Sequence, residues 1–170
     1  RRHTRFRNVT GVQTCALPIC EILRRMAIAL LPHADQLGIH DFRQHMDDRG
    51  LDQSLWSLLP ERCFSRSIGP DDWVLYVVNP DQLADAIAQF PAQGRRCSMW
   101  FWELEHLPRD WHQAFAWVDE LWTPTTFVHQ AVLNAAHELQ WEGKVQAVPL
   151  PLYIGADRKS TRLNSSHVSE

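Results

Sequence analysis

The stretch Trp73-Val-Leu-Tyr-Val-Val78, followed at once by Asn79-Pro-Asp-Gln82, decides the fold class of this chain. A continuous apolar run of strand length is typical of a strand covered on both faces, as in a parallel sheet. Asn79 and Pro80 are residue types that favour the start of a helix, and Gln82 suits a capping box. The stretch therefore predicts a buried strand that runs directly into a helix.

The same alternation of strand and helix continues on both sides of this unit. Further strands are expected at 97–102, 120–122 and 144–148, with a short one near 39–42. Helices are expected at 21–34, 80–90 and 108–118, and from a cap at Thr123 with Pro124 as first residue to Leu139. Alternating elements of this kind predict an α/β fold, with a Rossmann-like parallel sheet and helices on both faces.

Open parallel sheets bind ligands beyond the carboxyl ends of their strands. Four residues follow predicted strands in this way: Asn79, Trp102, Glu103 and Thr125. We therefore expect them to line one common cleft. Glu105 lies two residues beyond Glu103 and is a fifth candidate.

The segment Met99-Trp-Phe-Trp-Glu-Leu-Glu105 carries most of the chemical information. Aromatic faces can stack on the C–H surfaces of sugars, and carboxylates accept hydrogen bonds from sugar hydroxyls. A carboxylate beside an apolar wall can also act in acid–base chemistry. The alternative is that the tryptophans fill the core while Glu103 caps a loop.

The two ends of the chain have a different character. Val9 to Ile19 and Asp157 to Glu170 resemble translated sequencing-adapter DNA. We therefore expect residues 1–19 and 157–170 to be disordered tails of artefactual origin that pack on nothing, although natural basic tails are the alternative. The native domain is expected at residues 20–156.

Trimming these ends changes the balance of charge. Residues 20–156 hold ten of the 17 Lys and Arg but 18 of the 20 Asp and Glu, which is a formal charge of −8 against −3 for the whole chain. An acidic surface repels phosphate backbones, so nucleic-acid binding is disfavoured. No apolar run approaches the roughly 18 residues that a membrane span needs.

The sequence also argues against metal and thiol chemistry. Cys63 and Cys97 lie too far apart for a zinc pattern. No histidine pair has the spacing of a metal site, and His129 and His137 are expected on the solvent face of their helix. The catalytic residues, if any, cannot be named from these patterns.

Two segments resemble the group 1 family of retaining glycosyltransferases, which have the GT-B architecture of two Rossmann-like domains. One is Met99 to Glu105 with Leu107-Pro108 and Trp111 after it; the other is Val118-Asp-Glu-Leu-Trp-Thr-Pro-Thr-Thr-Phe-Val128. Tyr76 to Asp81 and Val145 to Pro151 are also similar to that family. The resemblance covers residues 71–152 well and 21–34 loosely.

The resemblance implies an incomplete N-terminal half of such an enzyme, which contacts a sugar or lipid-linked acceptor. Asn79, Trp102, Glu103, Glu105 and Thr125 are then acceptor-binding candidates. The nucleotide-sugar donor would bind mainly to a C-terminal domain that this chain lacks, so no cofactor is expected here. The family's first strand and glycine-rich loop are also expected to be missing, and the fragment to be inactive alone.

The resemblance further implies a cytoplasmic enzyme. It leaves open whether the full-length protein attaches peripherally to a membrane. Two other functions compete with it. One is a different nucleotide-binding domain of flavodoxin-like or dehydrogenase type, which a glycine loop or an acidic ribose-binding residue would favour. The other is a non-catalytic interaction module, which a patch of exposed tryptophans would favour.

Overall fold

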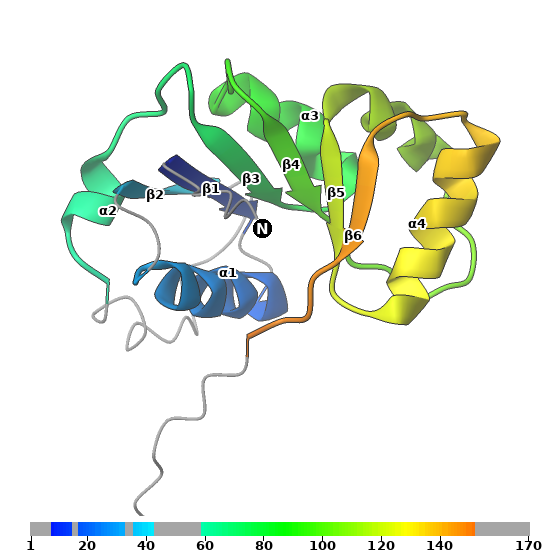
Figure 1. Ribbon diagram of the computed structural model, residues 1–170, viewed down its shortest axis with the longest axis horizontal. Helices are drawn as coiled ribbons and strands as arrows, with labels where there is room; N and C mark the ends of the chain where they lie inside the picture. Colours follow the sequence, from blue (N-terminus) through cyan, green and yellow to red (C-terminus); the bar gives the residue numbers. More distant parts are fainter. Residues whose placement is uncertain (1–7, 15–16, 33–35, 43–58, 152–170) are drawn as a thin grey trace, which may run out of the picture.

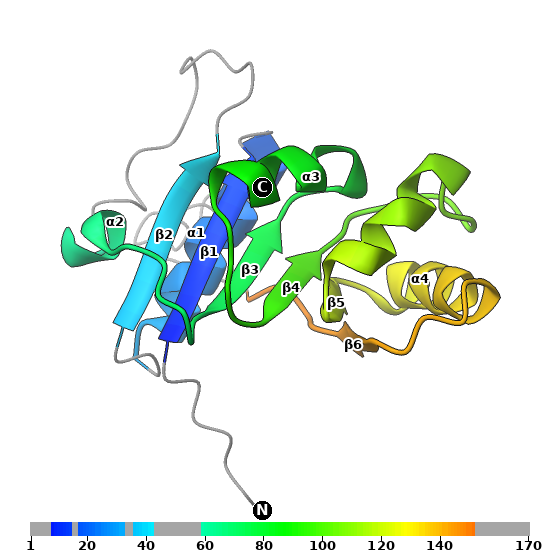
Figure 2. The same cartoon turned by 90° about the horizontal axis from the view of Figure 1, so that it is seen from above.

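A computed structural model describes residues 8–14, 17–32, 36–42 and 59–151 of the protein. The strands are β1 (Asn8–Thr14), β2 (Gln36–Phe42), β3 (Trp73–Val77), β4 (Arg96–Met99), β5 (Glu120–Thr123) and β6 (Lys144–Ala147). They form one sheet in the order β2-β1-β3-β4-β5-β6 (Figures 1 and 2), and every neighbouring pair is parallel. The predicted α/β, Rossmann-like fold is confirmed.

Helices cover both faces of the sheet. They are α1 (Leu17–Leu30), α2 (Arg62–Ser65), α3 (Pro80–Gln89), the 3-10 helix η2 (Arg109–Trp117) and α4 (Thr126–Glu138). Figure 1 shows α1 on one face, while the residues of α3, η2 and α4 pack on the other. No helix in the described part of the chain is long and apolar enough to cross a membrane.

Each face of the sheet has its own apolar core because the side chains of a strand alternate between faces. Val74 and Tyr76 of β3 point into the core beneath α3, η2 and α4, together with Trp100. Leu75 and Val77 point into the core beneath α1. Burial on both faces explains why this strand reads as an unbroken apolar run.

One expectation about the N-terminus is wrong. Asn8–Thr14, part of the stretch expected to pack on nothing, forms β1 and pairs with β2 on one side and β3 on the other. Backbone pairing needs only an extended segment, and β-branched residues favour one whatever the origin of the stretch. The sheet position of the strand that was expected to be missing is therefore filled by β1. The helix expected from residue 21 begins at Leu17, as α1. Residues 1–7 and 157–170 lie outside the described part.

The elements after β3 follow the predictions with small shifts. The segment expected as a strand to Trp102 ends at Met99, and the expected helix at 108–118 is of the tighter 3-10 type. Thr123 and Pro124 do not start the next helix; Thr125 is its N-cap. The Thr123 side chain is instead buried in the sheet, where its hydroxyl donates to the Gln146 carbonyl oxygen at 3.2 Å.

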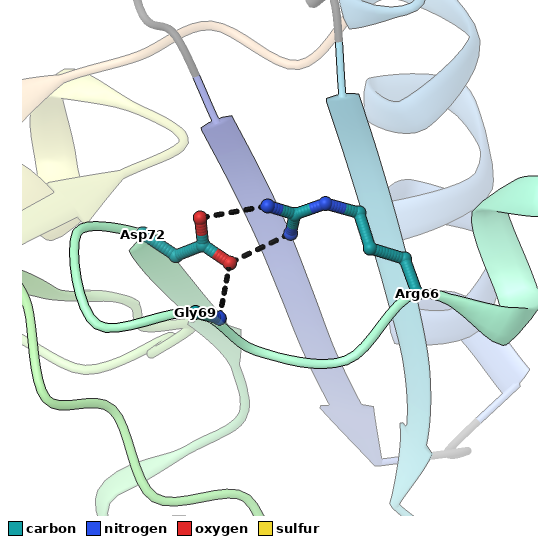
Figure 3. Close-up of polar contacts among 3 residues, drawn as sticks. All are labelled: Arg66, Gly69 and Asp72. Atoms are coloured by element: carbon teal, nitrogen blue, oxygen red, sulfur yellow. Dashed lines mark hydrogen bonds and ion pairs between the residues drawn. The ribbon is translucent and has the colours of Figure 1, made fainter.

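A largely buried ion pair lies directly before the start of β3 (Figure 3). The Arg66 guanidinium donates to both carboxylate oxygens of Asp72, at 2.6 and 2.8 Å, and the Gly69 N–H donates to the same carboxylate at 2.7 Å. The Asp72 side chain is 1% exposed and that of Arg66 18%. This pair joins the chain after α2 to the start of β3.

The ion pair has a titratable neighbour, His40 on β2. Burial lowers the pKa of His40 below its ordinary value of 6.5; the Arg66 charge lowers it further and the Asp72 charge partly opposes this. No described residue forms a hydrogen bond with the buried Nε2 atom of His40, and the His40 ring lies 5.3 Å from that of Phe90. The folded protein thus favours the neutral imidazole.

His40 should make stability fall in mild acid. The unfolded chain takes up a proton near pH 6.5 while the folded protein resists it, so stability is lost as the pH falls below 6.5 and levels off below the lowered folded pKa. We expect His40→Gln to reduce this loss in urea unfolding measured from about pH 7.5 to about pH 5. His137→Gln, at an exposed site on α4, is the matched control and should keep the parent profile. Equal profiles for parent and His40→Gln would contradict the assignment.

Candidate functional site

The candidate residues all follow strands at the carboxyl edge of the sheet. Asn79 comes after β3, Trp102 and Glu103 after β4, and Thr125 after β5. From β1 the chain adds β2 on one side and then β3 on the other, so the direction of winding reverses between β1 and β3. This topological switch point lies beside Asn79, which follows β3. The segments that follow β1 and β2 at this edge, 15–16 and 43–58, lie outside the described residues.

Asn79 joins two strand ends. It stands at the N-cap of α3, but its side chain does not bond to that helix. Its Oδ1 atom accepts a hydrogen bond from the backbone N–H of Phe101 at 3.0 Å. The expected capping role of the side chain is therefore wrong, and Asn79 instead holds the segment after β4 against the end of β3.

The three aromatic residues after β4 have different roles. Trp100 is fully buried; its Nε1 donates to Ser98 Oγ at 2.9 Å, and that hydroxyl donates to the Tyr76 carbonyl oxygen at 3.1 Å. Trp102 is half-buried; its ring meets Trp111 edge to face at 4.6 Å. Its Nε1 donates to the His106 carbonyl oxygen at 2.8 Å, which closes the turn after β4. Trp100 therefore belongs to the core, as the alternative interpretation expected, whereas Trp102 stands at the surface of the turn.

Glu103 and Glu105 project from this turn. Both are exposed, and Leu104 between them is 62% exposed. Among the described residues, neither carboxylate has a hydrogen-bond or ion-pair partner, so both remain able to accept hydrogen bonds from a ligand. The loop-capping alternative for Glu103 finds no supporting contact in the described part of the chain.

Thr125 has a structural task. It is exposed, and its Oγ1 accepts the Val128 N–H at 3.2 Å as the N-cap of α4. A polar pair that the sequence did not predict lies beside it. The buried Thr123 hydroxyl lies 3.2 Å from Nδ1 of His129, so His129 faces the strand end and not solvent, whereas His137 is exposed as predicted. Helical spacing alone could not reveal this, because the contact depends on the buried Thr123.

A second missed polar cluster lies on β5 and β6. Glu120 is 3% exposed, and its Oε1 accepts hydrogen bonds from Trp122 Nε1 at 2.8 Å and from Gln146 Nε2. Its other oxygen lies 3.8 Å from the Arg95 guanidinium. Burial, and after it the Glu120 charge, raise the pKa of Cys97 to about 12, so this thiol stays protonated and is a poor nucleophile.

Among the described residues, η2 and α4 help to line two cavities on the sheet face that they cover. The larger, about 700 Å³, lies at the amino-terminal edge; the smaller, about 230 Å³, lies between η2 and α4. Neither is lined by Asn79, Trp102, Glu103, Glu105 or Thr125. The structure brings Asn79 next to the Trp102 segment at the carboxyl edge, and a common cleft with Thr125 stays a prediction.

No metal site accompanies these residues in the described ranges. No group of three His, Cys, Asp or Glu side chains there is placed to hold a metal ion. The arrangement offers two free carboxylates, a half-buried indole and a hydrogen-bonded backbone that holds them at a strand end. Comparison of the chain with protein-family models, with curated proteins and with solved structures finds no match.

Proposed function

We propose that this chain is the acceptor-side domain of a retaining glycosyltransferase with GT-B architecture. The observation that carries the proposal is the turn after β4, where Trp102, Glu103 and Glu105 stand at the carboxyl edge of a parallel sheet. Asn79 fixes the start of this turn through the Phe101 N–H, and Trp102 fixes its end through the His106 carbonyl oxygen. The sequence resemblance to the family supports the same assignment.

In this proposal Glu103 and Glu105 accept hydrogen bonds from acceptor hydroxyls, and Trp102 supplies an apolar surface beside them. Carboxylates form strong, charge-assisted hydrogen bonds with such donors. Thr125 borders the same edge but acts mainly as a helix cap. The nucleotide-sugar donor would be held by a second domain, and the reaction would take place in the cytoplasm.

A binding experiment tests the acceptor role. The 170-residue chain is titrated with a panel of mono- and disaccharides and lipid-linked saccharides, with intrinsic tryptophan fluorescence as the readout. Glu103→Gln and Glu105→Gln should each weaken binding of the recognised saccharide about tenfold. Glu61→Gln, an exposed glutamate next to α2, is the matched control and should leave binding unchanged. Equal binding by all the variants, or no saccharide bound by the parent chain, would contradict the proposal.

A turnover assay tests the reaction class. With nucleotide sugars present, the chain alone should transfer no sugar, because catalysis requires donor and acceptor to be positioned together. Such positioning is worth about 7–11 kcal/mol, so its loss removes detectable turnover. A gene product that includes a second Rossmann-like domain should be active with retention at the anomeric carbon. Turnover by the short chain alone would refute this division of labour.

One observation favours a second candidate. The strand order β2-β1-β3-β4-β5 is that of flavodoxin-like domains, which bind a nucleotide cofactor at the switch point. The β1–α1 connection, Cys15-Ala16, contains no glycine, however, and a dinucleotide loop of the usual kind needs several. Titration with flavin mononucleotide and with NAD separates the candidates, since the glycosyltransferase domain should bind neither.

A further inference from the structure

The groove between η2 and α4 has the composition of a binding site. Its floor is formed by the buried side chains of Leu107, Ala131 and Ala135. Its rim is polar and comes from two elements and the turn before them: His106, Arg109, His112, Asn134 and Glu138. An apolar floor with a few converging polar groups is the usual form of a small-molecule pocket.

The donors on this rim are unsatisfied. Within the described residues, no carboxylate lies within ion-pair distance of the Arg109 guanidinium, and no side-chain hydrogen bond is made by His106 or His112. Asn134 Oδ1 already accepts a hydrogen bond from Gln130 Nε2 at 2.9 Å, which leaves the Asn134 amide N–H groups for another acceptor. Imidazole carries at least one N–H donor in either protonation state.

We propose that this groove binds a small phosphate-bearing ligand, with Arg109 as the charged anchor and His106, His112 and Asn134 as N–H donors. A guanidinium binds two phosphate oxygens at once, and a tetrahedral phosphate has enough oxygens for the remaining donors. The volume of about 230 Å³ suits a phosphate group with a small substituent. The proposal does not depend on the glycosyltransferase assignment.

The two cavities differ in charge, which selects the smaller one for an anion. His112 lines both of them. The larger cavity is lined by two carboxylates, Asp119 and Glu142, and by Arg95. Among the described residues that line the groove, Glu138 is the one carboxylate. In an acidic protein, an anion is bound best where donors outnumber carboxylates.

The groove is also held in a defined shape. The His106 carbonyl oxygen accepts from Trp102 Nε1, and the Trp102 ring packs against Trp111 of η2. Ala131 and Ala135 lie one turn apart on α4 and are buried. These contacts hold the backbone from which the donor side chains extend, so the groove needs little backbone rearrangement when a ligand binds.

A titration of the full chain with inorganic phosphate and with glycerol phosphate tests the proposal. Binding is measured from the backbone amide signals of Ala131 and Ala135 in nuclear magnetic resonance spectra. Arg109→Gln should weaken phosphate binding at least about tenfold. Arg109→Lys should recover part of the loss, because it keeps the charge without the two-pronged geometry. Glu138→Gln should strengthen binding about two- to fivefold by removing a like charge.

Arg62→Gln, at an exposed arginine of α2, is the matched control and should bind phosphate like the parent. Circular dichroism should show that all variants are folded. Phosphate binding that is absent from the parent, or that Arg109→Gln leaves unchanged, would overturn the proposal. So would equal losses in Arg109→Gln and Arg62→Gln, or acetate bound as tightly as phosphate, since these show attraction of anions without a built site.

Discussion

Asp72→Asn is expected to lower the free energy of unfolding by about 3–5 kcal/mol, because it breaks a buried ion pair and leaves one partner behind. The Arg66 guanidinium keeps its charge in a position that is only 18% exposed and loses its bonds to the two carboxylate oxygens of Asp72. The neutral amide can still accept from the Gly69 N–H, so Asp72→Ala should cost more than Asp72→Asn. Arginine does not lose its proton in proteins, so Arg66 stays charged in the variant as well.

Asp71→Asn is the matched control for this prediction. Asp71 is the neighbouring residue, carries the same charge and is exposed, and its substitution should change stability by less than about 0.5 kcal/mol. Urea unfolding monitored by tryptophan fluorescence measures both variants under the same conditions. A difference of less than about 1 kcal/mol between them would show that the pair in Figure 3 contributes little net stability.

Trp100→Ala should cause a loss of similar size, about 3–5 kcal/mol, by a different mechanism. The indole is fully buried and meets the Phe115 ring edge to face at 5.0 Å, so its removal leaves a large cavity beneath η2. The Ser98 hydroxyl also loses the donor Trp100 Nε1 but keeps its own bond to the Tyr76 carbonyl oxygen. Lost packing should therefore dominate over lost hydrogen bonding.

Two comparison variants separate these contributions. Trp100→Phe keeps an aromatic ring near Phe115 and should cost less than Trp100→Ala. Leu104→Ala alters an apolar residue four positions away that is 62% exposed, and it should be nearly neutral. The midpoint and slope of unfolding in guanidinium chloride give the free energy of unfolding of all three variants. A Trp100→Ala variant as stable as Leu104→Ala would contradict the core position of Trp100.

The sheet between β3 and β6 could be predicted from the sequence because each strand there carries a local signal. The run from Trp73 to Val78 is apolar since it is covered on both faces, and Pro80 marks a helix start through its own chemistry. β1 was not predicted, because its residues were assigned to an artefactual tail and its partners lie far along the chain. Pairing between Asn8 and Gln36 leaves no local trace.

The candidate site was predicted only in part for the same reason. Strand ends locate Asn79 and Trp102 correctly at one edge, since parallel strands finish together. Which tryptophan faces the core depends on where β4 ends, and the strand stops at Met99 where the sequence pattern continues to Trp102. The bond from Asn79 to Phe101 and the pair of Arg66 with Asp72 each join segments that no short-range pattern connects.

The position of β1 between β2 and β3 has a consequence for synthesis of the protein. Of the described strands this one is synthesised earliest, whereas its two neighbours, β2 and β3, end only at Phe42 and Val77. At translation rates of roughly 5–20 residues per second, β1 waits on the order of several seconds before β3 emerges. During that interval one side of an extended segment is unpaired and open to other nascent chains. A chaperone that shields extended segments on the ribosome should therefore raise the yield of folded protein more than one that acts after release.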